Sequence, residues 1–290
     1  MMRITLLLCL LLGLCAQGYA EEVEETRAVA ANGLVKIKNL RGELRIEGWS
    51  EAEVQIEGDL DELATGLRFE VNGSKTEIEI EMPSGNVNWG DGSDLVIMIP
   101  VASRLAVDAV STDLEVIGVH GGAQLRSISG DIEFSEGRGQ ISLKTVSGSI
   151  RSDQTQGNLR VSSSSGELEV SNHQGDADAQ TMSGEIELEV TGAKQIRSST
   201  ISGDINAVSS FLTDVQAEFS SVSGDVNIKL GAPENLTIVA RTTSGDIDND
   251  LSRDPVKKAF GQQSLHAQLG DGSGTLGIRT VSGNIELSES

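Results

Sequence analysis

Three histidines, His120, His173 and His266, are the side chains of this chain best suited to acid–base chemistry or zinc binding. Paired histidine ligands of a zinc site lie a few residues apart, and no two of these do. We predict that all three lie in loops or turns as hydrogen-bonded surface imidazoles. The sequence therefore predicts no catalytic residue and no cofactor site.

Carboxylates offer a second possible chemistry, because acidic residues recur after a repeated Ser-Gly. Stacked ~4.8 Å apart they would repel by about 0.9 kcal/mol per pair, and calcium would relieve that repulsion. The Gly-Gly-x-Gly-x-Asp pattern of calcium β-rolls is absent, however, and Ser149 and Asn284 interrupt the series. We predict a solvated acidic edge with no metal, and keep a calcium ladder as the alternative. The candidate ligands are Asp131, Glu167, Glu185, Asp204, Asp225 and Asp246.

The first twenty residues predict export. Arg3 precedes a short leucine-rich segment, and Gly18-Tyr19-Ala20 offers small residues where a signal peptidase reads. We predict a signal peptide over residues 1–20, cleaved after Ala20, and a periplasmic or secreted protein. Both cysteines, Cys9 and Cys15, lie in this segment, so the mature chain has no disulfide and no thiolate metal site.

A short internal repeat predicts the elements that position these residues. Ser-Gly recurs with a hydroxyl residue two places before the serine and an aliphatic residue two places after the glycine. The successive intervals between glycines are 18, 18, 18, 19, 21, 21 and 38 residues. The repeated glycines are Gly130, Gly148, Gly166, Gly184, Gly203, Gly224, Gly245 and Gly283.

Alternation with period two on both sides of each Ser-Gly predicts two short strands per repeat. Such units cannot fold alone, because both of their edges stay unpaired until copies stack. We predict an all-β chain, a parallel β-solenoid (β-helix) of ~18–21-residue two-strand coils. In it, the repeated hydroxyls would bond along their own column or to corner amides, and glycine would permit the bend. An antiparallel sandwich is the alternative.

The repeat is blurred at both ends of the chain. We predict an N-terminal β region with atypical first coils and a cap over residues 21–105, and the repeat region over 106–290 with an insert at about 249–274. Because the last coil ends near the C-terminus, Ile278 to Leu287 would form an open edge. We predict that the segment near Phe260, or self-association with a second chain, caps that edge.

Charge and hydropathy exclude several classes of partner. Without residues 1–20 the chain carries 21 basic and 44 acidic residues, a net charge of −23. Such a surface repels nucleic acid and anionic lipids, so an envelope protein or a polysaccharide is the expected partner. No later stretch reaches the ~18 apolar residues of a transmembrane helix.

The chain resembles the bacterial family named putative adhesins, from about Val23 to Ser290. The similarity rests on "NLRGELRIEG", on "LVIMIPVASRLAVDAVSTDLEV" and on the series "SISGDIEF", "TVSGSI" and "TMSGEIEL". It implies an exported envelope protein that acts non-enzymatically, as a binding, adhesin-like or scaffold module. A polysaccharide-active β-helix enzyme is the alternative function, by analogy of fold alone.

Overall fold

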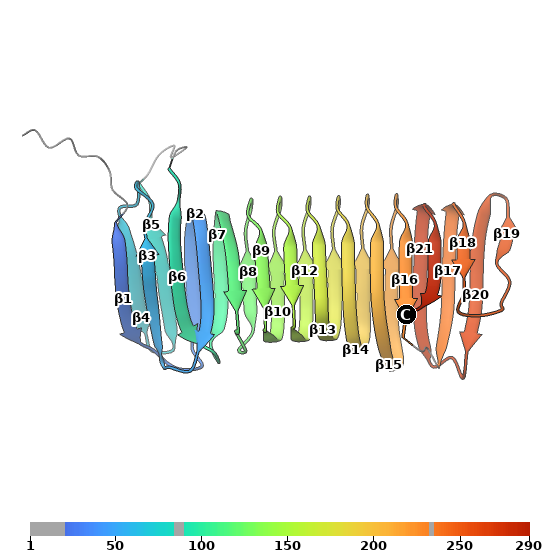
Figure 1. Cartoon of the computed structure of the whole chain (residues 1–290), viewed down its shortest axis with the longest axis horizontal. Coiled ribbons are helices and arrows are strands. Elements are labelled where there is room, and N and C mark those ends of the chain that lie inside the picture. The colour runs from blue at the N-terminus through green and yellow to red at the C-terminus, as the bar shows by residue number, and fades with distance from the viewer. Residues whose placement is uncertain (1–20, 84–89, 232–234) are drawn as a thin grey trace, which may run out of the picture.

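The structure, a computed structural model, describes residues 21–83, 90–231 and 235–290. This part of the chain is all-β: 22 strands join into one hydrogen-bonded sheet, and none of these residues forms a helix. Figure 1 shows the strands side by side along the long axis of the molecule. The predicted signal peptide lies outside the described residues.

The strands, in chain order, have the following bounds. In the first third they are β1 (Glu22–Ala28), β2 (Leu34–Trp49), β3 (Glu53–Asp59), β4 (Gly66–Asn72), β5 (Lys75–Glu81), β6 (Ser93–Pro100) and β7 (Arg104–Ile117). In the middle they are β8 (Ala123–Arg126), β9 (Ile132–Ser135), β10 (Arg138–Lys144), β11 (Ile150–Asp153), β12 (Gln156–Ser162), β13 (Leu168–Gln180), β14 (Ile186–Ser199) and β15 (Ile205–Ser220). In the last part they are β16 (Val226–Leu230), β17 (Leu236–Ser244), β18 (Ile247–Asn249), β19 (Lys257–Ala259), β20 (Gln262–Leu269), β21 (Gly274–Ser282) and β22 (Ile285–Glu289).

The middle of the chain repeats a coil of two strands. In the first strand Leu159 pairs in parallel with Ile141, eighteen residues before it, and with Ala177, eighteen after it. In the second strand Ile150 pairs in the same way with Ile132 and Leu168. The prediction of an all-β chain is therefore confirmed, and residues eighteen apart in this region pair in parallel and in register. In β13, β14 and β15 the second strand of one coil continues into the first strand of the next within one strand.

The repeated hydroxyls support the corners differently from the prediction. Each donates to the backbone carbonyl at the corner of the neighbouring coil, as Thr145 Oγ1 does to Gly130 O at 3.1 Å. The prediction of bonds to other hydroxyls or to amides was wrong, because the corner amides already donate to backbone carbonyls of the next coil. The same bond recurs from Ser163, Thr181, Thr200, Ser221, Thr280 and Thr242.

At Gly130, Gly148 and Gly166 glycine is required by close approach between coils, whereas the later corners at Gly203, Gly224 and Gly245 also have a positive φ of 152°, 157° and 159°. A Cβ added at Gly166 would lie 1.9 Å from the carbonyl oxygen of Gly148, and one at Gly148 would lie 2.2 Å from that of Gly130. The φ angles of Gly130, Gly148 and Gly166 lie outside the left-handed region. Glycines that do need a positive φ form a second column at the opposite bend of the coils, at Gly139, Gly157 and Gly175 (φ 93°, 123° and 129°).

At the N-terminal end, spatial order departs from sequence order. β2 forms a complete coil that pairs in parallel with β7 on one side and with β5 and β6 on the other. β4 then pairs antiparallel with β5, and β3 antiparallel with β6. β1 follows on β3, also antiparallel. The first coil in the sequence, β2, therefore lies inside the molecule, behind the layer of β5 and β6 and the antiparallel strands β4, β3 and β1.

The C-terminal end repeats this arrangement. β21 and β22, the last strands in the sequence, lie between β15 and β16 on one side and β17 and β18 on the other, all in parallel pairing. Outside them β20 pairs antiparallel with β17, and β19 with β20. In Figure 1 the dark red strand β21 lies to the left of the orange strands β17, β18 and β20, next to β16.

The expected open edge from Ile278 to Leu287 was therefore wrong. Both side chains are at most 3% exposed, and their strands are paired on both sides. The segment around Phe260 does lie at an end of the molecule, but its strands cover β17 instead. A terminal coil gains twice as many backbone hydrogen bonds between two parallel neighbours as at an edge, which favours the inserted position.

Candidate functional site

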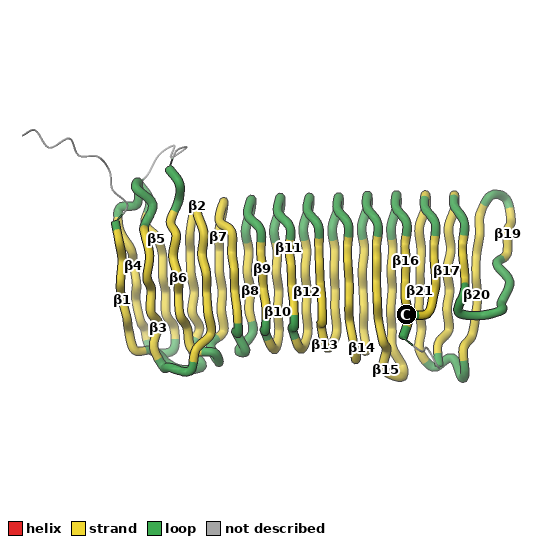
Figure 2. The backbone as a smooth tube through the Cα atoms, in the orientation of Figure 1, coloured by secondary structure: helices red, strands yellow, loops and turns green. Residues whose placement is uncertain are grey.

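The corner edge of the stacked coils is the candidate functional surface. Figure 2 shows the Ser-Gly corners as a row of green loops along one side of the molecule. Backbone bonds link them from coil to coil, for example from Ser202 N to Met182 O and from Ser282 N to Val222 O, at 3.0 and 2.9 Å. Side chains at equal positions of each corner therefore form straight rows along the stack.

One of these rows is apolar and exposed. It consists of the apolar residues two places before the corner glycines, together with Val110, which lies two places before Thr112 at the matching position of the first corner. We call it the corner ridge: Val110, Ile128, Val146, Met182, Ile201, Val222 and Val281. Met182 and Ile201 are the most exposed, at 54% and 52%. The row is interrupted once, by Ser164. Isolated exposed apolar residues are ordinary on protein surfaces, whereas a contiguous row marks a contact surface.

The sequence prediction did not identify this ridge. An apolar residue next to buried aliphatic positions looks like core, and only the tight corner turns it outward. One signal in the sequence could have revealed the exposure of this position, which lies between the repeated hydroxyl residue and the repeated serine. Two repeats carry a polar residue there, Ser164 and Thr243, which a buried position would disfavour.

A row of carboxylates, the acidic row, follows the corner glycines at Asp131, Glu167, Glu185, Asp204, Asp225 and Asp246. The structure brings these predicted residues together along the stack. The aspartates stabilise the next coil: Asp131 Oδ1 accepts from Ser149 N at 2.7 Å, and Asp204 Oδ1 accepts from Asp225 N at 2.8 Å. Asn284 takes the same role toward Asp246 N, at 3.0 Å, which explains why an amide can interrupt the row.

The glutamates of the row raise the local negative charge. Glu187, on the outer face of β14, lies near Glu185, Glu167 and Glu169. Partial burial and the charge of these three neighbours raise the pKa of Glu187. No group of three or more His, Cys, Asp or Glu side chains within residues 21–83, 90–231 and 235–290 has the geometry to hold a metal ion.

Chelation is expected to leave the stability of the protein unchanged. Because aspartates of the acidic row already accept backbone N–H groups, calcium would have to compete with those bonds. We expect the thermal midpoint with a chelator to stay within about 1 °C of that with added calcium, since only a ligand bound by the folded state shifts the midpoint. A clear rise with calcium, lost on mutating Asp204 and Asp225 to asparagine, would establish a calcium ladder instead.

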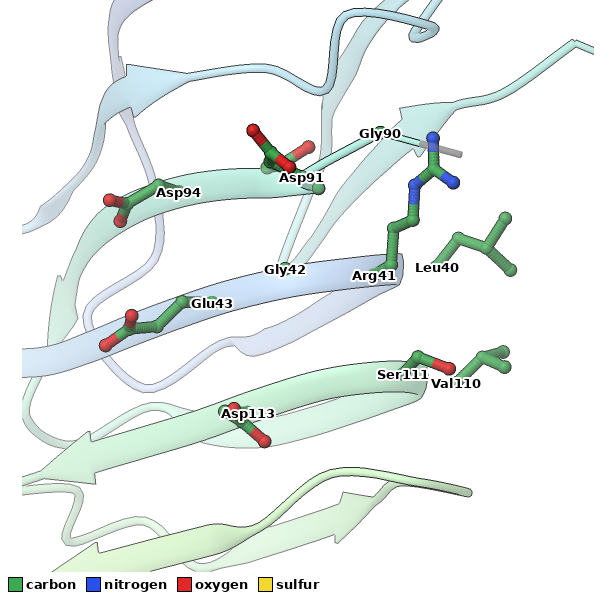
Figure 3. A pocket seen from close by; sticks show the side chains of 12 residues that line it. Leu40, Arg41, Gly42, Glu43, Gly90, Asp91, Asp94, Val110, Ser111 and Asp113 are labelled. Atoms are coloured by element: carbon green, nitrogen blue, oxygen red, sulfur yellow. The ribbon is translucent and has the colours of Figure 1, made fainter. Parts of the chain in front are cut away.

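A hollow lies at the N-terminal continuation of the corner edge. It has a volume of about 830 Å³ and is lined by Arg41, Glu43, Asp91, Asp94 and Asp113, among others. Figure 3 shows the Glu43, Asp94 and Asp113 carboxylates on three neighbouring strands. The hollow has acidic walls, and among its described lining residues there is no histidine or cysteine.

One buried ion pair fixes the wall of this hollow. Arg41 Nη2 donates to Asp61 Oδ1 at 2.9 Å, and Arg41 Nε also contacts Asp61 Oδ2. The Asp61 carboxylate, 1% exposed, accepts a further bond from Leu63 N. The Arg41 hydrogen bond lowers the pKa of Asp61, which favours the ionised pair. This pair joins the loop after β3 to β2 and is structural.

Comparison with known families identifies the fold family. The family model described as Toastrack DUF4097 matches residues 35–288. The chain belongs to the Toastrack DUF4097 family. The predicted family relationship is confirmed by this match. A search of curated proteins gave no match.

Solved structures similar to this Toastrack chain come from three bacteria. A putative adhesin from Bacteroides fragilis NCTC 9343 is 12% identical, with 93% of this chain and 98% of the other covered and a TM-score of 0.44. A putative adhesin from Parabacteroides distasonis ATCC 8503 is also 12% identical, over 94% and 98%, with a TM-score of 0.35. A putative cell adhesion protein from Clostridium sporogenes ATCC 15579 is 13% identical, over 93% and 100%, with a TM-score of 0.23.

Two of the three histidines of the Toastrack chain differ from the sequence prediction. His120 is exposed in a loop, as expected, and His266 is exposed but lies within β20. His173 is fully buried: its Nδ1 lies 2.9 Å from Thr155 Oγ1 and its Nε2 lies 3.2 Å from Asp176 O. A carbonyl can only accept, so the Nε2 proton is donated to Asp176 O and Nδ1 accepts from the threonine hydroxyl. The three rings are far apart in the stack.

His173 is expected to make stability pH-dependent. Burial lowers its pKa below the ordinary value, because the charged ring would lose its hydration. Its contribution to stability is complete above the unfolded-state pKa, about 6.5, and is lost as pH falls from there through the folded pKa. We expect His173→Gln to flatten the pH dependence of the urea midpoint below pH 6.5. The matched variant His120→Gln, at an exposed ring, should keep the wild-type slope; equal slopes in all three proteins would contradict this.

Nothing in the described part of the chain is a helix long and apolar enough to cross a membrane.

Proposed function

We propose that this chain is a non-enzymatic, exported protein of the cell envelope that acts as an adhesin-like binding or scaffold module. The observation that carries the proposal is the corner edge, where an exposed apolar ridge and an acidic row follow the same succession of coils. A long row of like side chains suits contact with an extended partner. An active site, by contrast, is built from a few unlike groups that converge on one point.

We infer further that the stacked coils form a β-solenoid, entered by an atypical N-terminal β region over 21–105. The parallel pairing of residues eighteen apart supports this inference. Export rests on the predicted signal peptide, residues 1–20, with cleavage after Ala20. The location that follows is the periplasm or the extracellular surface, where an envelope protein or polysaccharide would be the partner.

Binding to isolated envelope tests the proposal. Labelled protein spanning residues 21–290 is mixed with sedimented envelope from the source bacterium, and bound protein is measured against concentration. We expect saturable binding at moderate ionic strength. Absence of saturable binding to envelope protein or polysaccharide fractions would contradict the proposed function.

A polysaccharide-active enzyme is the competing function, and the acidic hollow beside β2 and β6 is where it would have to work. Incubation with envelope and plant-type polysaccharides should release no reducing ends. Turnover that disappears in a single Asp94→Asn or Asp113→Asn variant would establish the enzyme instead.

A further inference from the structure

We infer that the corner ridge binds a basic amphipathic α-helix of a partner protein, which lies along the stack with its apolar stripe on the ridge and its lysines or arginines on the acidic row. The inference rests on the proposed function and names the partner's chemistry. Two independent features carry it: the spacing of the ridge and the charge beside it.

The spacing of the ridge fits a helix. Neighbouring coils lie ~4.8 Å apart, so Met182, Ile201, Val222 and Val281 form a row of four side chains about 14 Å long. An apolar stripe on a helix recurs every 3.5 residues on average, about 5.2 Å, and so stays within roughly 1.5 Å of the ridge over these four positions. An extended strand repeats on one face about every 6.8 Å and loses register after one coil. A straight row of side chains is also what packs into the groove between the residue rows of a helix.

The charge beside the ridge selects a basic helix. Three residues after each ridge position comes the acidic row, which carries Glu185, Asp204 and Asp225 along this same stretch. Partial burial and the charges of Glu185, Glu167 and Glu169 raise the pKa of Glu187, which shows that carboxylates crowd together on this stretch. A cationic side chain placed beside the ridge would relieve this repulsion.

A second copy of the chain fits the ridge poorly. A copy packed ridge on ridge in the antiparallel sense would set acidic row against acidic row. A copy packed ridge on ridge in the parallel sense would place the two acidic rows on opposite flanks of the contact. Both carry the cost of a net charge of −23 on each chain.

A synthetic helix tests the inference directly. The probe is a labelled 18-residue peptide with leucine at heptad positions a and d and lysine at the remaining positions. Its controls are the same leucine pattern with glutamate in place of lysine, and the leucine–lysine peptide with its order scrambled. By fluorescence anisotropy at about 150 mM salt we expect saturable binding of the patterned basic helix and at least tenfold weaker binding of both controls. Absence of binding by the patterned helix would overturn the inference.

Variants of the protein locate the binding. The triple variant Met182→Ser/Ile201→Ser/Val222→Ser should bind at least tenfold more weakly, because it removes three half-exposed apolar side chains from the contact. The matched control Val96→Ser/Val208→Ser, at exposed apolar residues away from the ridge (37% and 40% exposed), should bind as wild type. Glu167→Gln/Glu185→Gln should weaken binding severalfold and reduce its salt dependence. All these sites are exposed, so circular dichroism should show an unchanged fold.

Three further outcomes would each overturn the inference. If the ridge variant binds the peptide as wild type does, the contact is electrostatic only and the inference fails. If light scattering shows a dimer of the wild type that the ridge variant loses, the ridge binds a second copy instead, and the inference fails. If the ridge variant still binds isolated envelope like wild type, the proposed function stands while this inference does not.

Discussion

Replacing Gly166 by alanine is expected to lower the free energy of unfolding by about 3 kcal/mol or more, the upper range for overpacking inside a fold. The added Cβ would lie 1.9 Å from Gly148 O. This oxygen also accepts the hydroxyl bond of Ser163, at 3.1 Å. Backbone on both sides of the contact is held by the stack, so the neighbour cannot yield as a flexible side chain would. Urea denaturation monitored by circular dichroism measures the effect.

The control for this substitution is Gly277→Ala. Gly277 lies in β21, its φ is outside the left-handed region, and its added Cβ would approach no atom more closely than 3.9 Å, at Ala217 O. We expect a change below about 1 kcal/mol there, because alanine loses less backbone entropy than glycine on folding. Equal changes in the free energy of unfolding for Gly166→Ala and Gly277→Ala would contradict the prediction. They would mean that glycine at the corner is not required by the close approach of the coils.

Deleting Gly274–Ser290 is expected to abolish cooperative folding of the C-terminal half. The deletion removes β21 and β22 from between two layers and leaves β15 and β16 without their parallel partners on that side. It also exposes Val226 and Phe219, which are at most 1% exposed in the whole protein. The loss of two ladders and their apolar contacts exceeds the 5–15 kcal/mol by which domains are typically stable. Thermal unfolding by calorimetry and amide exchange across 205–249 measure the effect.

Deletion of β1 is the matched control, because this strand also lies near a chain end but pairs on one side only, with β3. A chain that starts at Val29 should unfold cooperatively with a small drop in midpoint. In the whole protein, amides of Leu276 to Leu287 should exchange as slowly as those of β12. Fast exchange there, or a midpoint unchanged by the C-terminal deletion, would show that the last coil is a free edge.

Much of the candidate surface could be predicted from the sequence, and some could not. The acidic row was identified because its residues recur at a fixed offset from the corner glycines. Its bonding was not, since the acceptor role of Asp131 depends on where Ser149 N of the next coil lies. The corner ridge was missed because Ile128 and Met182 resemble core residues until the tightness of the corner is known. The prediction that His173 lies on the surface was wrong for a related reason. Its ring is buried at a bend where it contacts Thr155 Oγ1 and Asp176 O, and these contacts form only when the coils stack.

The amino-acid sequence alone was enough to predict the all-β repeat unit, its length and the residues that form the stacked columns. These follow from period-two alternation and from an interval of about eighteen residues, which are local properties of the chain. The order of the coils at the two ends is visible only in the folded protein. A repeat unit can pair equally well with a copy before or after it, so no interval in the sequence says that β2 and β21–β22 lie inside their neighbours. The inserted order is favoured because backbone N–H and C=O groups at the ends of the stack need hydrogen-bond partners. They find them when the terminal coils lie between two neighbours and antiparallel strands cover the last layer.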